Sequence, residues 1–541
     1  MTNPSTELAR AVVTALRGSG VREVVVAPGS RNAPLSFALF DAQEVGTAAR
    51  PGLRLHTRID ERTAGFLALG LAKTSHRPVA VTCTSGTAAA NLLPAVVEAA
   101  HAGLPLVVVT ADRPARMRGT DANQTTDQVD LFGTFAATLD VAAGDVDLDD
   151  LLRFVRTHEG VRPVHLNVQL DDPLLPDDDG WDGGEVPAWA STLMAPPLDE
   201  LVLEAGPRTV VVAGDDAGPR ARQLAEAAGW PLLAEPSSGS RTGDHAIRSY
   251  RLLLAGSLGP RVERAVVFGH PTLSRPVSRL LARGDVEVVS VRHGGMWAAR
   301  PYAVAAEADV VRLEGEDDPA WLEEWRAADR KASRDLDALL ASEPDLTPHE
   351  AVGAVSSAVP PGGLLVVGAS NPIRDLDLMA ARYEVGARRY VIANRGLAGI
   401  DGTTSSAIGA ALGRPGSTRS IALMGDVTFL HDTTGLVIGP REERPDLTIV
   451  VVNDDGGSIF ATLEQGAPAY ADRFDALFGT PHGVDVASLC AAMRVPHLRV
   501  DSLPELEQAL AMPNGGIEVV EVRVRRDNRR ELDERIRALA P

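Results

Sequence analysis

The feature that most constrains the fold is a series of short, β-branched apolar runs that each end in glycine and polar residues. Two of these runs lie within Ile421–Phe460: the first ends at Gly425-Asp426, and the second, Leu447–Val452, ends at Asn453-Asp454-Asp455-Gly456. Apolar runs without polar alternation are typical of strands covered on both faces in a parallel sheet. Because the carboxyl ends of parallel strands meet at one edge, we expect the polar clusters to gather there.

The same pattern recurs along the chain, with helical spacing between successive runs. In the first third, the expected strands are Val24–Ala27, Leu53–Ile59, Val79–Thr84 and Leu106–Thr110. The expected helices between and around them are Glu7–Gly18, Thr63–Lys73 and Ala88–Ala100. Regular alternation of strands and helices predicts right-handed crossovers. The predicted fold class is therefore α/β, with three doubly wound domains and mostly parallel sheets.

The length of the chain and one irregular stretch predict the domain organisation. A chain of 541 residues is too long for a single core. The stretch Asp171–Leu198 is rich in Pro, Asp, Gly and Trp and lacks periodicity, which is typical of a linker. We expect an α/β domain at 1–180, a linker and central scaffolding domain at 181–345, and a third α/β domain at 346–541. The central Gly214–Gly218 stretch does not match a dinucleotide-binding fingerprint.

Composition excludes several classes of partner. The formal charge of −20 argues against binding to nucleic acid or to an anionic membrane, because both need a basic surface. The two cysteines, Cys83 and Cys490, form no metal-ligand spacing and suit a reducing compartment. No apolar run approaches the ~20 residues of a membrane span, and no signal peptide is evident. We expect a soluble cytoplasmic protein without stable membrane insertion.

The two clusters that follow the runs in Ile421–Phe460 predict a metal site. Asp426 and Asn453 are 27 positions apart, which leaves room for one helix and one strand. A carboxylate, an amide and a Gly-rich turn at neighbouring strand ends suit a hard cation that in turn holds a diphosphate. The alternative is a pair of ordinary turns, since Gly, Asp and Asn favour turns in any case.

Arginines at expected strand ends form a second constellation. Arg31, Arg113, Arg374 and Arg395 each lie beside Gly, Pro or Asn after such a strand. A single surface arginine is usually a solvated charge. Four in equivalent positions favour a site for substrates that carry several carboxylates, because guanidinium binds carboxylate in a bidentate manner.

The metal pattern resembles the cofactor motif of thiamine-diphosphate-dependent enzymes. The resemblance implies that Asp426, one side chain of the Asn453-Asp454 pair and the carbonyl of Gly456 bind Mg²⁺ or Mn²⁺, and it leaves open which of the pair is the ligand. It also implies that Glu61 is the catalytic carboxyl that hydrogen-bonds the cofactor's pyrimidine ring. The alternative is that Glu61 is an acidic residue in the first turn of a helix. The implied cofactor-binding residues are Ser85, Gly86, Thr87, Asn91, Ile400, Gly425, Asp426, Val427 and Asn453.

A set of further motifs narrows the resemblance. They occur in order as Ala27–Leu35, Asp60–Arg62, Ala68–Lys73, Thr84–Ala88, Thr110–Pro114, Ala122–Gln124, Asn394–Gly396 and Gly399–Gly402. Together they resemble the MenD family, the 2-succinyl-5-enolpyruvyl-6-hydroxy-3-cyclohexene-1-carboxylate synthases of menaquinone biosynthesis. The resemblance implies a C–C bond-forming transferase that decarboxylates 2-oxoglutarate and adds the succinic semialdehyde unit to isochorismate by 1,4-addition. It also implies a homodimer or a dimer of dimers, with each site shared between two subunits.

The resemblance places the substrates as well. The implied substrate-binding residues are Ser30, Arg31, Asn32, Arg113, Asn123, Gln124, Ser370, Arg374, Arg395, Ile459 and Phe460. From the central domain, Arg292 or His293 would supply a basic side chain. Two alternatives remain: an acetolactate-synthase-like carboligase that uses pyruvate, and a non-catalytic regulator that binds the cofactor. The number of arginines opposes the first, and an intact Glu61 and Asp426 oppose the second.

Overall fold

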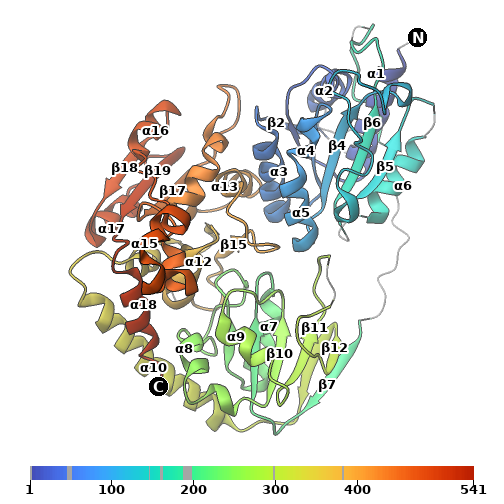
Figure 1. Ribbon diagram of the computed structural model, residues 1–541. Helices are drawn as coiled ribbons and strands as arrows, with labels where there is room; N and C mark the ends of the chain where they lie inside the picture. The colour runs from blue at the N-terminus through green and yellow to red at the C-terminus, as the bar shows by residue number, and fades with distance from the viewer. Residues whose placement is uncertain are drawn as a thin grey trace.

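A computed structural model describes residues 3–44, 52–144, 147–158, 162–178, 180–186, 198–296, 299–380 and 383–541. The chain forms three α/β domains (Figure 1), with the first in blue and cyan, the central one in green and yellow, and the third in orange and red. Every strand pairing within the three main sheets of the described residues is parallel. The predicted α/β class with mostly parallel sheets is confirmed.

The first domain is built on a six-stranded sheet in the order β2-β1-β3-β4-β6-β5. Its strands are β1 (Glu23–Val26), β2 (Arg54–Thr57), β3 (Val79–Cys83), β4 (Leu106–Asp112), β5 (Ala137–Val141) and β6 (Val164–Gln169). Its helices are α1 (Pro4–Gly18), α2 (Ala33–Asp41), α3 (Glu61–Ser75), α4 (Thr87–Ala90), α5 (Leu93–Ala102) and α6 (Leu148–His158). Central strands β3 and β4 are buried along their whole length, as expected for strands covered by helices on both faces.

The third domain has a six-stranded sheet in the order β15-β14-β16-β17-β19-β18. Its strands are β14 (Leu364–Val367), β15 (Tyr390–Ala393), β16 (Ser420–Gly425), β17 (Leu447–Asn453), β18 (His497–Val500) and β19 (Ile517–Arg523). Its helices are α11 (Pro348–Ala358), α12 (Asn371–Met379), α13 (Thr403–Leu412), α14 (Asp426–His431), α15 (Ala471–Phe474), α16 (Val486–Ala492), α17 (Leu503–Ala511) and α18 (Arg529–Arg537). When strands are numbered within each domain, this order is the same as in the first domain: 2-1-3-4-6-5.

The central domain is smaller and lies below the other two in Figure 1. Its five-stranded sheet has the order β12-β11-β10-β8-β9, and β7 pairs with β13 in a separate ribbon. Its strands are β7 (Glu200–Glu204), β8 (Thr209–Ala213), β9 (Leu232–Ala234), β10 (Arg264–Phe268), β11 (Glu287–Val291), β12 (Ala306–Ala308) and β13 (Val310–Glu314). Its helices are α7 (Pro219–Ala228), α8 (Tyr250–Ala255), α9 (Arg275–Leu281) and α10 (Pro319–Ala341), of which α10 leads into the third domain.

The first and third domains share one hydrophobic core. A single buried cluster extends from Val25 and Leu67 of the first domain to Ile408 and Ala422 of the third. Helices α3 and α13 lie side by side at its centre (Figure 1). A Cβ atom at Gly70 would lie 2.1 Å from the carbonyl oxygen of Ser406, so only glycine allows this approach. The two domains are therefore packed as one body.

Several element boundaries differ from the expected ones. The helix expected at Ala88–Ala100 divides into α4 and α5, because Pro94 is accommodated only in the first turn of a new helix. The predicted domain boundaries after residues 180 and 345 stay predictions, and residues 187–197 of the expected linker lie outside the described residues.

Candidate active site

The third domain brings two carboxyl groups together at the ends of β16 and β17. These strands are neighbours, with Gly425 opposite Val452, so the residues after them lie at the same edge of the sheet. A cavity of about 140 Å³ opens there. The predicted site residues that line it are Ser370, Ile400, Gly425, Asp426, Val427, Asp454, Gly456, Ile459 and Phe460.

Asp426 is held rigidly at the base of this cavity. Its side chain is 3 % exposed and accepts hydrogen bonds from the backbone N–H groups of Val427 (2.7 Å) and Gly456 (2.9 Å). His482 Nε2 lies 3.1 Å from Oδ2 of Asp426. Because His482 Nδ1 accepts a hydrogen bond from Val484 N, the ring proton is on Nε2 and is donated to Asp426. Three donors thus fix the orientation of one carboxylate.

The two carboxyl groups of the cavity destabilise each other's charge. Burial and the nearby Asp426 raise the pKa of Asp454 to about 7, and burial also raises the pKa of Asp426. A divalent cation between them would remove this repulsion and supply the missing counter-charge. The donor set, two carboxylates with backbone carbonyls nearby, is the one that Mg²⁺ prefers. The residues present therefore fit a magnesium ion.

Asn453 does not face the cavity. Its Nδ2 donates to Glu521 Oε1 (2.6 Å) of β19, and its Oδ1 accepts from Asp455 N (2.9 Å), so the buried amide is engaged with its own domain at both ends. The expectation that Asn453 binds the cofactor or the metal through its side chain stays a prediction, and these bonds do not favour it. Of the two alternatives left open by the sequence, the geometry favours Asp454.

Arginine side chains from two strand ends lie close to this cavity. Arg374 donates to the carbonyl of Ser370 (2.7 Å), and its pKa is lowered by burial and by the neighbouring Arg395. Arg395 is 2 % exposed, donates from Nη2 to Thr272 Oγ1 (2.8 Å), and has a buried Nε without a partner. A half-buried and a buried cation side by side, with an unused donor on the buried one, indicate a site for an anionic ligand.

The first domain gathers a second group of predicted residues at the ends of β3 and β4. Ser85 Oγ donates to the carbonyl of Gln124, and Gln124 Nε2 donates back to the carbonyl of Ser85 (2.9 and 2.8 Å). Arg113 Nη2 donates to the carbonyl of Asn123 (3.0 Å), and its pKa is lowered by burial and by the nearby Arg31. These five residues therefore form one polar cluster.

Other predicted residues of the first domain lie at different places. Asn32 is fully buried, and its Nδ2 donates to the carbonyl of Ala27, which supports the turn, while its Oδ1 has no partner among the described residues; its role in substrate binding stays a prediction. The side chains of three other predicted residues are exposed: Ser30, which precedes Arg31, and Thr87 and Asn91, at the two ends of α4. Glu61 begins α3, directly after its N-cap residue Asp60. The alternative role of an acid in the first helical turn is thus compatible with the position of Glu61.

Within one chain the two groups do not form one cavity. Among the described residues that line the 140 Å³ cavity, none belongs to the first domain. The neighbours of Glu61 instead contact the third domain elsewhere: Arg62 donates to the carbonyl of His431, and Thr434 donates to Asp60. The two groups are therefore separate in the described part of one chain.

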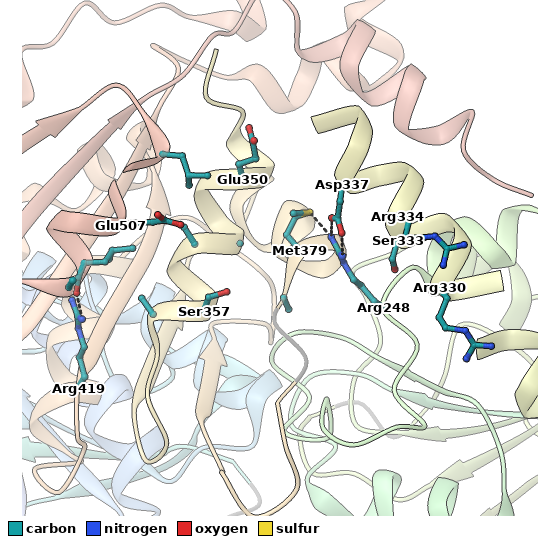
Figure 2. Close-up of a pocket in the computed structure, with 17 residues that line it drawn as sticks. Arg248, Arg330, Ser333, Arg334, Asp337, Glu350, Ser357, Met379, Arg419 and Glu507 are labelled. Carbon is teal, nitrogen blue, oxygen red and sulfur yellow. Dashed lines mark hydrogen bonds and ion pairs between the residues drawn. The ribbon is translucent and has the colours of Figure 1, made fainter. Parts of the chain in front are cut away.

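A larger groove of about 880 Å³ lies between α10, α11 and α17, and it contains none of the predicted site residues (Figure 2). Four of its seven charged side chains have partners among the described residues. Arg248 is paired with Asp337 at 2.7 Å, Glu350 caps the start of α11, and Arg419 bonds to the carbonyl of Leu510. The smaller cavity is therefore the candidate active site.

Comparison with known proteins agrees with this geometry. Residues 6–131 match the family model of the thiamine pyrophosphate enzyme N-terminal TPP binding domain, and residues 375–522 match the C-terminal TPP binding domain. A protein of Nocardioides sp. named 2-succinyl-5-enolpyruvyl-6-hydroxy-3-cyclohexene-1-carboxylate synthase is 66 % identical, with 99 % of this chain and 98 % of the relative covered. Proteins of the same name from Kineococcus radiotolerans and Rhodococcus erythropolis are 47 % and 45 % identical, each with 99 % of both chains covered.

The chain belongs to this family of thiamine-pyrophosphate-dependent synthases. Its membership accounts for the two separate groups of site residues, one in each matched domain. None of the helices in the described part of the chain has both the length and the apolar character of a membrane span.

Several residues at the synthase site carry no recognisable motif in the sequence. Asn371 donates to Ser458 Oγ (2.7 Å), and both line the cavity beside Asp454. Arg529 from α18 also lines it, and is paired with Asp375 at 2.8 Å.

His293 lies in the central domain with a pKa lowered by burial, whereas Arg292 is paired with Asp199 and Asp309 at the surface. Of the two basic side chains expected from the central domain, only His293 is thus free of a surface ion pair.

Proposed function

We propose that the chain is a magnesium- and thiamine-diphosphate-dependent synthase that decarboxylates 2-oxoglutarate and adds the succinic semialdehyde unit to isochorismate. The product is 2-succinyl-5-enolpyruvyl-6-hydroxy-3-cyclohexene-1-carboxylate, an intermediate of menaquinone biosynthesis. Full-length relatives that carry this name support the proposal. The observation that carries it is the pair of the half-buried Arg374 and the buried Arg395 beside the two-carboxylate cavity, since among the described residues neither arginine has a carboxylate at ion-pair distance.

The residues of the third domain would hold the cofactor and the metal. Asp426, Asp454 and the carbonyl of Gly456 would bind Mg²⁺, and Gly456 needs φ +143° with a Cβ position only 2.1 Å from the carbonyl oxygen of Gly479. The N-terminus of α12 opens into the same cavity and favours an anionic group. When bound, thiamine diphosphate supplies the nucleophilic carbon and the electron sink that decarboxylation of a 2-oxoacid requires.

The remaining residues would act on the cofactor ring and the substrates. The carboxyl group of Glu61 would hold a proton at the pyrimidine ring nitrogen. Arg374 and Arg395 would bind carboxylates, and Ile459 with Phe460 would form an apolar wall that excludes water. The first-domain residues Ser30, Arg31, Arg113, Asn123 and Gln124 would face isochorismate.

A homodimer, alone or paired into a tetramer, follows from the separation of the two groups. The first-domain group of one copy would complete the cavity of its partner. An exposed apolar side chain near this group supports the arrangement: Ile59, two residues before Glu61, is 74 % exposed. The free, buried cysteines Cys83 and Cys490 suit the reducing cytoplasm, where we place the enzyme.

An absorbance assay tests the proposed activity. The purified protein is incubated with 2-oxoglutarate, isochorismate, thiamine diphosphate and Mg²⁺, and isochorismate consumption is followed with and without each component. We expect turnover that requires all four. A parallel reaction with pyruvate in place of 2-oxoglutarate should give none, because one carboxylate cannot use both arginines. Turnover with pyruvate alone would contradict the proposal.

A further inference from the structure

We propose that Glu98 of the first domain and Thr272 of the central domain are positioning residues that hold Arg395 in place for its carboxylate ligand. The inference deepens the proposed function, on which it rests, by assigning specificity to side chains outside the third domain. It gives the central domain a part in substrate recognition through Thr272, in addition to the scaffolding role and the basic side chain expected from its sequence.

Glu98 fixes the backbone that follows Arg395. The side chain lies on α5, is 5 % exposed, and accepts hydrogen bonds from Gly396 N (2.8 Å) and Leu397 N (2.7 Å), one at each carboxylate oxygen. Gly396 packs so closely that a Cβ there would lie 2.7 Å from the carbonyl oxygen of Glu98. Lys73 on α3 donates to the carbonyl of Ala393, on the other side of Arg395. The first domain thus holds the turn from both ends.

Thr272 fixes the guanidinium group itself. Its Oγ1 accepts a hydrogen bond from Arg395 Nη2 at 2.8 Å. The turn that carries Thr272 follows β10 and is held in turn by the buried Glu235, which accepts from Leu273 N at 2.9 Å. A neutral hydroxyl leaves the charge of Arg395 uncompensated, whereas a carboxylate in its place would compete with the substrate. The acceptor therefore orients the arginine without neutralising it.

This arrangement has a consequence for binding. Arginine has a long, flexible side chain, and ordering it at the moment of binding weakens affinity. With the backbone and one Nη already fixed, the unpartnered Nε and the remaining donors are presented to a carboxylate in advance. Loss of the clamp should therefore raise the KM of the carboxylate substrate more than it lowers kcat.

The central test replaces Thr272 with Val, which has the same shape and no acceptor. Thr272→Val should raise KM for 2-oxoglutarate or isochorismate roughly 10-fold, the effect of one lost hydrogen bond to a charged group, with kcat within about 2-fold. Thr272→Ser restores the acceptor and should recover most of the lost affinity. Thr418→Val is the matched control, because Thr418 is also exposed and bonds a turn carbonyl, that of Pro361, in a remote loop.

A second variant tests the first-domain side of the clamp. Glu98→Gln places an amide donor against an N–H group and should lower kcat/KM by roughly 10- to 100-fold while the affinity for thiamine diphosphate stays within about 2-fold. Glu518→Gln is its control. Glu518 is equally buried and accepts from Thr448 and Asn514, and it lies on β19, far across the third-domain sheet from β15, which precedes Arg395. Thermal unfolding of every variant shows whether a change in kinetics follows a change in stability.

The outcomes separate the inference from the proposed function. If the wild-type protein does not turn over the two substrates, the proposed function is wrong. If it does, and Thr272→Val has the wild-type KM for both substrates, the clamp is wrong. An equal effect in Thr418→Val, or no recovery in Thr272→Ser, also overturns it. Crystal structures of wild type and Thr272→Val provide a readout without substrate: a guanidinium group in the same place in both would contradict the inference.

Discussion

The first and third domains have the same strand order, 2-1-3-4-6-5, yet they present different chemistry at the same edge of the sheet. The third domain places carboxylates and glycines after β16 and β17 and arginines after β14 and β15. The first domain places hydroxyls, amides and Arg113 after β3 and β4, Arg31 after β1, and Glu61 after β2. The shared topology thus sets where a ligand can bind, and the residues after each strand decide which part of it is bound.

The difference between the domains should appear as a division of labour. Removal of a third-domain group should weaken binding of the metal and the cofactor, whereas removal of the first-domain carboxyl should stop turnover and spare binding. Variants in the two domains should reveal this division in turnover and in metal binding, and smaller effects of backbone strain and of one buried carboxyl group in protein stability.

Glu61→Gln should have the largest effect. A loss of the carboxyl group that holds the pyrimidine proton should lower kcat by roughly 1,000-fold. Thiamine diphosphate should still bind with an affinity within about 3-fold of wild type, because the third-domain group is unchanged. Steady-state rates and tryptophan-fluorescence titration measure the two quantities. Wild-type turnover would remove Glu61 from the catalytic role.

Replacement of Asn453 and of Asp454 should show which of these two residues binds the metal and which stabilises the fold. Asp454→Asn should weaken Mg²⁺ affinity by roughly 10- to 100-fold, as expected when a group around the metal is lost. Asn453→Ala should instead lower the free energy of unfolding by about 1–3 kcal/mol, because Glu521 and Asp455 N lose their buried partner. Metal titration and urea unfolding of both variants decide the matter. A stronger effect of Asn453→Ala on Mg²⁺ affinity would reverse the assignment.

Two helix N-termini with the same unusual backbone should respond in opposite directions. Gly86 has φ 82° and ψ −136°, and Ser370 has φ 75° and ψ −139°. Gly86→Ala should lower the free energy of unfolding by about 2 kcal/mol, because an L-residue is strained there. Ser370→Gly removes such strain and should raise it by about 1 kcal/mol. Chemical denaturation measures both, and a destabilised Ser370→Gly would show that the serine side chain outweighs the strain.

The pH dependence of stability should change on replacement of Asp432. This side chain bonds Ser405 N and Oγ, and burial raises its pKa to about 6. The folded protein therefore keeps a proton that the unfolded chain, with a pKa of about 4, has released. The resulting stabilisation is fully present below the unfolded pKa and is lost as the pH rises through 6. Asp432→Asn cannot ionise, so its stability relative to wild type should rise by about 1 kcal/mol from pH 5 to pH 7 in urea unfolding.

Burial accounts for part of what the sequence predicted, although the buried strand β6 was not predicted and the edge strands β2 and β15 were. Strands β3, β4 and β17 were predicted because helices cover both their faces, which gives continuous apolar runs. The edge strands β5 and β18 were not predicted. Each has partly exposed or polar positions, such as Asp140 or Arg499, and lacks the apolar run that marks a central strand. Their assignment depends on the neighbouring strand, which the local sequence does not contain.

The prediction of site residues from sequence was also limited to what the local sequence contains. Asp426, Gly456 and Arg395 were predicted because a local motif marks each of them. The choice between Asn453 and Asp454 depends on which side chain faces β19, where Glu521 binds the amide. Thr272 bonds Arg395 from 123 positions away in the chain, and Glu98 bonds the next two residues from 298 and 299 positions away, so no spacing rule connects them. Contacts of this kind arise from the packing of the three domains.

The close contact of α3 with α13 also limits how such chains can be recombined. A Cβ at Gly409 would lie 2.2 Å from the carbonyl oxygen of Leu67, just as one at Gly70 would meet Ser406. Chimeras that take the first domain from one relative and the third from another join two helices that were selected separately. Those that inherit α3 and α13 from one parent keep the backbone contact intact. The unit of exchange in this chain is thus the helix pair, and the domain boundary is the wrong place to cut.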